Sequence, residues 1–362
     1  MLNKSLFLPE YEAIAEPAVS SMMRRPTVIG SRDCFGSPGQ KHIVNVLSID
    51  VEDYFHPSEL GGNMSTWTSY PSRVDVGLFF LLDLLAARQV RATFFVLGWV
   101  AMRHPHLIRK IAKAGHEIGC HSHCHRLVYS LTPDEFQRDT LEAVKAIQDA
   151  SGVTPRMYRA PSYSVTSNAL WALEILASCG FTHDSSIYPI VHDRYGIPGF
   201  PRHASYIATP SGGILEIPVA TVQLGRRVMP VGGGAYMRLF PYRYMAAGLR
   251  RINCQEKQPA CLYLHPWELD PEQPRLTRRV ISRLRTYTGL AGMRDKMNRL
   301  LDDFAFAALT DVFPLPNPVQ IARMEARETL TPSPVCPAHS RPGSMPVESV
   351  SYYRSDIRRT CD

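Results

Sequence analysis

Residues 43–53 read Ile-Val-Asn-Val-Leu-Ser-Ile-Asp-Val-Glu-Asp, and this stretch decides the fold. Its first seven residues are mostly apolar and rich in β-branched side chains, which favours a buried strand of a parallel sheet. Acidic residues follow where the strand ends, namely Asp50, Glu52 and Asp53. Because α/β folds bind their ligands at the carboxyl ends of the strands, the stretch predicts an α/β protein with a functional site at this strand end.

A second stretch, His121-Ser122-His123-Cys124-His125, supplies imidazoles. His121 and His125 are four residues apart, so on a helical turn they lie on the same side and converge on one ion. His123 is then expected to point elsewhere. The spacing alone also suits a pair of surface or core histidines. Together with the acidic strand end, however, two imidazole nitrogens and a carboxylate oxygen are typical of a catalytic zinc-type site that keeps one position open for water.

The rest of the chain alternates between apolar β-type runs and helical patterns, which is typical of βα units around a mostly parallel sheet. Ser72 is the expected N-cap of the first helix, and Thr132-Pro133-Asp134-Glu135 predicts a capping box. The number of units favours a barrel-like closure, although spacing alone also allows an open sheet. The predicted strands are residues 93–97, 116–121, 157–158, 181–182, 214–217 and 261–264, and the predicted helices are residues 72–85, 106–114 and 133–150.

Composition divides the chain into three parts. With 362 residues, 45% of them hydrophobic and 20% charged, the chain can bury a substantial core. Residues 1–40 and 314–362 are rich in Pro, Ser and charged residues without a sustained period, so we predict poorly ordered tails. Between them, residues 41–313 are the predicted catalytic domain.

Charge and cysteine content limit which partners and which cellular compartment we expect. The formal charge of +7 lies in a few local runs, which argues against nucleic acid as a partner. No run of apolar residues is long enough for a membrane span, and Glu10, Glu12 and Glu16 fall where a secretory signal needs an apolar core. The eight cysteines form no dense framework. We therefore expect a cytoplasmic protein with reduced thiols.

Five segments form a recognisable set: residues 48–53, residues 121–125, Arg159-Ala160-Pro161-Ser162-Tyr163, Asp184-Ser185-Ser186 and Leu264-His265-Pro266-Trp267-Glu268. In order and content these segments resemble the polysaccharide deacetylase family with the NodB homology domain, the carbohydrate esterase group that removes N-acetyl groups from amino sugars. The resemblance covers about residues 41–313, and it implies a distorted (β/α) barrel of about seven strands, fewer than the usual eight. The Asp-Val-Glu-Asp-Tyr-Phe, Arg-Ala-Pro-Ser-Tyr-Ser and His-Pro-Trp-Glu forms resemble the branch associated with exosortase-type exopolysaccharide loci.

The acidic cluster departs from the family, which usually has two adjacent aspartates, one as base and one as metal ligand. Here Val51 follows Asp50. In an extended strand Asp50 and Glu52 point to one face and Asp53 to the other, which favours Glu52 as the ligand beside His121 and His125. If the strand ends at Asp50 and the chain turns, Asp53 reaches the ion instead. Asp50 is the predicted base, and Zn²⁺ is the expected divalent ion.

The remaining site residues are assigned largely through the resemblance. It implies that Arg159 orients Asp50 and that the backbone N–H of Tyr163 meets the developing oxyanion. His265 should end a strand beside the site and act as general acid. Asp184 is expected to hold the ring of His265, as an acidic residue does in relatives, although Asp-Ser-Ser suits a turn or helix cap equally well.

The predicted function is a metal-dependent hydrolase that removes N-acetyl groups from amino sugars of a polysaccharide, or of its lipid-linked precursor, in exopolysaccharide biosynthesis. Its expected partner is an N-acetylated glycan. A basic run at residues 275–299 suggests peripheral association with anionic lipid or a lipid-linked glycan at the inner face of the membrane. Two alternatives stay open: a hydrolase of a small cyclic amide or ureide, and a non-catalytic metal- or glycan-binding relative.

Overall fold

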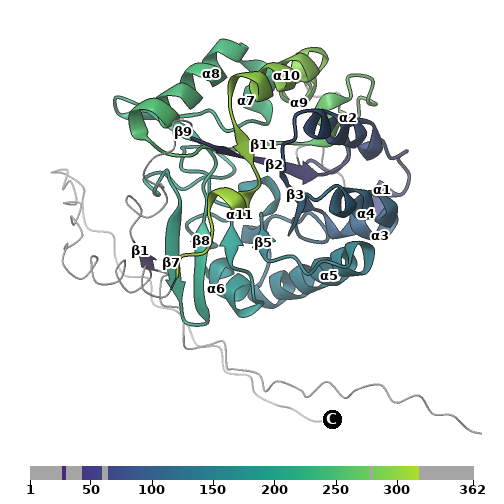
Figure 1. The fold of residues 1–362 in the computed structure, drawn as a ribbon. Helices are drawn as coiled ribbons and strands as arrows, with labels where there is room; N and C mark the ends of the chain where they lie inside the picture. The colour runs from purple at the N-terminus through teal and green to yellow at the C-terminus, as the bar shows by residue number, and fades with distance from the viewer. Residues whose placement is uncertain (1–26, 30–42, 59–63, 278–279, 318–362) are drawn as a thin grey trace, which may run out of the picture.

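The computed structural model describes residues 27–29, 43–58, 64–277 and 280–317 (Figure 1). Within this part the main sheet follows the order β1-β7-β8-β6-β5-β4-β3-β2-β11, and β12 pairs with β2. The strands are β1 Thr27–Ile29, β2 Asn45–Val51, β3 Thr93–Val96, β4 Glu117–Cys120, β5 Met157–Tyr158, β6 His183–Asp184, β7 Ser205–Thr209, β8 Gly212–Glu216, β11 Cys261–Leu264 and β12 Phe306–Ala307; β9 Thr221–Leu224 and β10 Arg227–Pro230 form a separate hairpin.

Seven consecutive strands of this sheet, from β8 to β11, run parallel. Among the described residues, β8 and β11 do not pair with each other, and the irregular segment 217–220 lies between them. Its Ile217 N–H donates to the Asp184 carbonyl of β6 at 2.8 Å, and its Ala220 N–H donates to the Cys261 carbonyl of β11 at 3.0 Å. The result is the predicted α/β arrangement of about seven parallel strands, bent toward closure.

Helices cover the outside of the sheet, with α7 to α10 gathered at the top of Figure 1, α2 at the upper right, and α3 to α6 beside and below the strands. Every residue of β2, β3 and β4 is buried, because other parts of the protein pack against both faces of these strands. The helices are α1 Met64–Trp67, α2 Val74–Ala87, α3 Gly98–Arg103, α4 Pro105–Lys113, α5 Pro133–Ser151, α6 Trp171–Ser178, α7 Ala235–Leu239, α8 Tyr242–Arg250, α9 Val280–Tyr287, α10 Met293–Asp303 and α11 Leu309–Val312.

The structure confirms one of the two predicted helix N-caps and contradicts the other. The capping box of α5 is confirmed, since the Glu135 N–H donates to Thr132 Oγ1 at 3.3 Å and the Thr132 N–H donates to Glu135 Oε2 at 2.8 Å. The predicted Ser72 cap of α2 is wrong. Ser72 donates its hydroxyl to Asp53, and it is Asp53, at the end of β2, that accepts from the first N–H groups of the helix.

Both predicted tails lie largely outside the described residues, so they and the domain limits at 40 and 313 stay predictions. Three residues of the first tail form β1, which pairs antiparallel with β7. No helix in the described part of the chain combines the length and the apolar character that crossing a bilayer requires. Five cysteines fall in this part, and all five are free thiols.

Candidate active site

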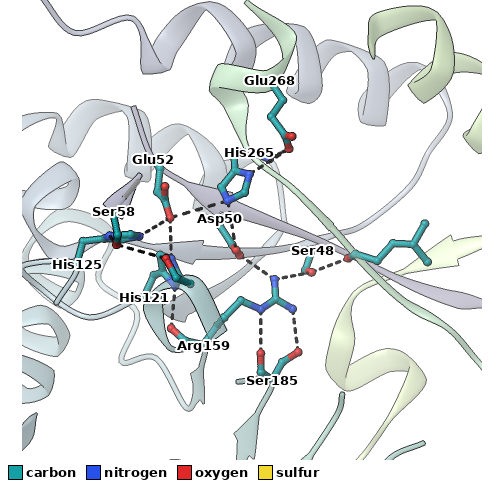
Figure 2. Close-up of polar contacts among 12 residues, drawn as sticks. Ser48, Asp50, Glu52, Ser58, His121, His125, Arg159, Ser185, His265 and Glu268 are labelled. Atoms are coloured by element: carbon teal, nitrogen blue, oxygen red, sulfur yellow. Dashed lines mark hydrogen bonds and ion pairs between the residues drawn. The ribbon is translucent and has the colours of Figure 1, made fainter. Parts of the chain in front are cut away.

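Three buried side chains meet at the carboxyl ends of β2 and β4. Glu52 follows β2, and its Oε1 lies 2.8 Å from His121 Nε2 and 2.9 Å from His125 Nε2 (Figure 2). One ligand atom from each of the three lies within 4.8 Å of the others, and all three residues are buried. One carboxylate oxygen and two imidazole nitrogens around a common point form the donor set that suits a zinc-type ion.

The segment that carries the two histidines is a loop and not the helical turn expected from their spacing. Ser122 and His125 have φ of 61° and 50°, which turns the chain back sharply. The loop is held from within by the Ser122 hydroxyl, which accepts from the His125 N–H at 3.0 Å. Asp139 of α5 holds it from outside by accepting from the N–H groups of His123 and Cys124 at 2.8 and 3.0 Å. The histidines converge as predicted, but for a different geometric reason.

The second ring nitrogen of each histidine is turned away from the common point. His121 Nδ1 lies 2.7 Å from the Arg159 carbonyl, which can only accept, so Nδ1 donates there and Nε2 is the nitrogen directed at the common point. His125 Nδ1 lies 3.5 Å from the Ser58 hydroxyl. Burial opposes ionisation of Glu52, but His125, His265 and His121 outweigh it and hold the carboxyl pKa well below its usual value. The three residues therefore fit a divalent cation.

Asp53, the other candidate ligand, lies away from the histidines at the start of α2. Its carboxylate accepts from the N–H groups of Arg73 and Val74 at 2.9 and 3.2 Å and from the Ser72 hydroxyl at 2.5 Å. These are the contacts of a helix N-cap, where a carboxylate satisfies otherwise unpaired donors. The structure thus brings Glu52 to the histidines and assigns Asp53 to the helix.

Asp50, the predicted base, is held by the buried guanidinium of Arg159. Arg159 Nη1 donates to Asp50 Oδ1 at 2.7 Å and to the Ser48 hydroxyl at 2.8 Å. Its Nε and Nη2 donate to the carbonyl and hydroxyl of Ser185 at 3.1 and 2.9 Å (Figure 2). Burial opposes the charge, yet Asp50 outweighs it and raises the guanidinium pKa. The fork leaves Asp50 Oδ2 facing the site.

His265 follows β11 and lies on the opposite side of Asp50 and Glu52 from the histidine loop. Its Nε2 is 3.9 Å from Asp50 Oδ2 and 4.0 Å from Glu52 Oε1. Its Nδ1 is 3.0 Å from Glu268 Oε2. Burial lowers the pKa of the imidazole, but Glu52, Glu268 and Asp50 outweigh it and raise that pKa to about 9. A pKa in this range favours the protonated ring at neutral pH, and Glu268 orients that ring, as a proton donor requires.

The residue that orients His265 is Glu268 and not Asp184. Asp184 faces Glu216, its partner in the β6–β8 register, and accepts from the Ser186 hydroxyl at 2.6 Å. Burial raises the carboxyl pKa of both members of this pair, and in Glu216 the neighbouring Asp184 adds to the rise. Asp184 is thus part of a buried carboxyl pair in the sheet. Glu268 was missed from sequence, although a glutamate three residues after His265, with proline between, is a capping-box pattern.

Tyr163 does not offer its N–H to the site in this geometry. The N–H donates to the Ala160 carbonyl at 3.1 Å inside a short 3-10 turn, Pro161–Tyr163, and both Ser162 and Tyr163 have positive φ. An oxyanion would have to displace this hydrogen bond. Tyr188 is fully buried and Trp267 is 6% exposed, so both aromatic side chains pack inside the protein.

Comparison with known proteins finds two family models that match parts of this chain. Residues 79–183 match the family model described as polysaccharide deacetylase, and residues 185–314 match a model described as domain of unknown function (DUF3473). The first match confirms the resemblance to the polysaccharide deacetylase family for residues 79–183, which include the segments 121–125 and 159–163. The second match is compatible with the exosortase-associated branch, which stays a prediction.

Individual relatives are similar over part of their length. A peptidoglycan-N-acetylglucosamine deacetylase of Bacillus cereus is 33% identical over 95 residues, which cover 26% of this chain and 34% of that protein. A chitooligosaccharide deacetylase of Bradyrhizobium sp. is 31% identical over 129 residues, which cover 35% of this chain and 56% of that protein. The matches thus span less than two thirds of either relative. A Mycobacterium smegmatis crystal structure described as a polysaccharide deacetylase has the same fold, with a TM-score of 0.54, 22% identity and coverage of 84% of this chain and 97% of that one.

Proposed function

We propose that this protein is a metal-dependent hydrolase that removes N-acetyl groups from the amino sugars of a polysaccharide or of its lipid-linked precursor. One observation carries the proposal. His265 Nε2, a proton donor, lies within 4.0 Å of both Asp50 and Glu52, so acid, base and metal-ligand group surround one small space. Hydrolysis of an amide needs these three functions together.

Glu52, His121 and His125 would hold the ion. When bound, a divalent cation such as Zn²⁺ supplies positive charge that polarises the acetamide carbonyl and acidifies a water molecule. The choice of ion rests on the donor set, since nitrogen and oxygen donors in a small buried group favour zinc over magnesium or calcium.

The chain's own residues divide the proton transfers between them. Arg159 fixes Asp50 Oδ1, so Oδ2 is the atom that accepts the proton of the attacking water. Glu268 fixes His265 Nδ1, so Nε2 is the atom that donates to the departing nitrogen. An amide nitrogen leaves only when protonated, which makes this second transfer essential. The products are acetate and a free amino sugar.

The finer proposals concern substrate and place. The named activities of the relatives support an N-acetylated glycan, and the motif forms support a role in exopolysaccharide biosynthesis. We also propose a cytoplasmic location at the inner face of the membrane. In its support, Val280 and Leu284 on α9 are 71% and 58% exposed beside the exposed Arg283 and Arg285. Stronger co-sedimentation with anionic than with neutral vesicles is the expected result, and equal co-sedimentation would contradict it.

An acetate assay on the purified, zinc-loaded protein tests the main proposal. We expect acetate release from N-acetylglucosamine oligomers, with one free amine formed for each acetate. A small cyclic amide and a cyclic ureide serve as comparison substrates, because another C–N hydrolase would use the same base and ion. Ring opening without acetate release would show that the protein is a hydrolase of cyclic amides or ureides instead. Turnover of none of these substrates by metal-loaded protein would contradict the proposal and favour a non-catalytic relative.

A further inference from the structure

Glu268, the residue that orients His265, is itself held between two cationic groups. Its Oε2 lies 3.0 Å from His265 Nδ1 and also accepts from the His265 backbone N–H at 3.0 Å (Figure 2). Its Oε1 accepts from Arg238 Nε at 2.6 Å. The side chain of Glu268 is fully buried and that of Arg238 is 3% exposed. A carboxylate buried to this degree needs such partners, because an unpaired buried charge costs several kcal/mol.

Arg238 reaches Glu268 from another part of the chain and is fixed at both ends of its guanidinium. It lies on α7, and its Nη1 donates to the carbonyls of Thr286 and Thr288, at the end of α9, at 2.8 and 3.2 Å. Its guanidinium carbon lies 5.2 Å from the ring centroid of Trp267. The Trp267 ring in turn stacks on His265, with centroids 5.1 Å apart and planes 25° apart. Arg238 therefore contacts both side chains that hold the His265 ring.

Removing Arg238 would affect the two partners of His265 together. Burial raises the carboxyl pKa of Glu268, and Arg238 and His265 outweigh it and lower that pKa. Without Arg238, Oε1 loses its one hydrogen-bond partner among the described residues, and the carboxylate is free to rotate away from Nδ1. The imidazole would then lose the contact that fixes which nitrogen points to the site.

We propose that Arg238 is a positioning residue for the proton donor: it holds Glu268, and through Glu268 and Trp267 it keeps His265 Nε2 aimed at the departing nitrogen. The inference rests on the proposed function, because it concerns the proton that an amide cleavage needs. Among the described residues, the guanidinium of Arg238 contacts Glu268, Trp267 and the carbonyls of Thr286 and Thr288, and none of these is an ion-binding residue. The contribution of Arg238 should thus be confined to the step that depends on proton donation.

Substrates with different leaving groups distinguish this positioning role of Arg238 from a merely structural one. The nitrogen of an N-acetyl sugar must be protonated to depart, whereas p-nitrophenolate departs from p-nitrophenyl acetate without a proton. For Arg238→Gln we expect hydrolysis of an N-acetylglucosamine oligomer to fall about 10- to 100-fold, the range for residues that support a ligand or catalytic group from behind. Hydrolysis of the ester should change less than about threefold, so the amide-to-ester ratio is the measured quantity.

Arg294→Gln is the matched control. Arg294 also reaches the segment after His265, since its Nε donates to the Leu269 carbonyl at 2.9 Å, and it lies over the ring of Phe80, but it has no contact with Glu268. We expect the amide-to-ester ratio of this variant to equal that of the wild-type protein. A lower ratio in both arginine variants would overturn the inference, because it would show a general loss of packing around His265.

A double-mutant cycle tests whether Arg238 acts through Glu268. Glu268→Gln should lower the ratio by at least as much as Arg238→Gln, and the double variant should be no lower than Glu268→Gln alone. Fully additive losses would overturn the inference.

If Arg238→Gln does not fold, Arg238→Lys replaces it. Lysine keeps the charge but lacks the planar fork, so the amide-to-ester ratio of this variant should fall between those of wild type and Glu268→Gln. An unchanged ratio would count against the inference. Wild-type protein that releases no acetate would contradict the proposed function itself, whereas wild-type acetate release with an unchanged ratio in the variants contradicts only the role of Arg238.

Discussion

Asp50→Asn should lower acetate release by at least about 100-fold while the bound metal stays near one ion per chain, because general-base contributions are typically of this size or larger. Asparagine has the same shape and keeps an oxygen that can accept from Arg159, but it cannot take a proton from water. Asp50 is outside the group of Glu52, His121 and His125, so metal affinity should change little. The measurement combines a rate assay with elemental analysis of the same sample.

Stability needs attention in this variant, because Arg159 is fully buried and would lose the charge of its partner. Removing one member of a buried ion pair costs about 3–5 kcal/mol when nothing replaces it, and the asparagine oxygen offsets part of that. Thermal unfolding of the variant shows whether the lost rate reflects lost fold. Normal folding, normal metal and near wild-type acetate release would together contradict the role of Asp50.

Asp53→Asn is the control for this result, since it makes the same chemical change on a neighbouring buried carboxylate. Asparagine caps helices about as well as aspartate, so the free energy of unfolding should fall by less than about 1 kcal/mol. Acetate release and metal content should stay within a few-fold of wild type, because Asp53 contacts the helix and not the histidines. Loss of metal in Asp53→Asn would restore Asp53 as the acidic ligand.

His121→Ala should lose the metal and the activity together. With His121 removed, only Glu52 and His125 of the three converging residues remain, and two protein ligands hold zinc weakly compared with three. We expect well under one ion per chain after dialysis, and no acetate release above that of Asp50→Asn. The decisive readout is metal content by elemental analysis, because it does not depend on turnover.

His123→Ala is the control for this second variant. His123 lies between the two proposed ligands in sequence and is equally buried, but its Nε2 is directed to Glu142 at 3.4 Å. Its loss should leave one metal ion per chain. A His121→Ala protein that still binds one ion, or a His123→Ala protein that loses it, would show that the ion is held elsewhere.

The strands that could be predicted from sequence are the short, apolar and buried ones. The predicted strand at residues 261–264 coincides with β11, and that at 93–97 differs from β3 by one residue. Strands β1 and β7 and the β9–β10 hairpin were not predicted. All of these strands pair antiparallel, and β7, β9 and β10 are only partly buried, so they carry a weaker apolar signal than the central strands.

The site was predictable in its residue types but not in how they are held. Alternation along β2 correctly favoured Glu52 over Asp53 for the position beside the histidines, because the strand continues to Val51. The positive φ of Ser122 and His125 carries no sequence signal, so the loop was taken for a helical turn. Asp184 was misplaced because its carboxyl partner, Glu216, belongs to a strand more distant in sequence than any local pattern reaches.

The most direct test is a crystal structure of the zinc-loaded protein with anomalous scattering measured above and below the zinc edge. We predict one strong anomalous peak at about 2.0–2.2 Å from Glu52 Oε1, His121 Nε2 and His125 Nε2, with Asp50 and His265 bordering it. A peak held by other side chains, or none at this position in protein shown to contain zinc, would contradict the account.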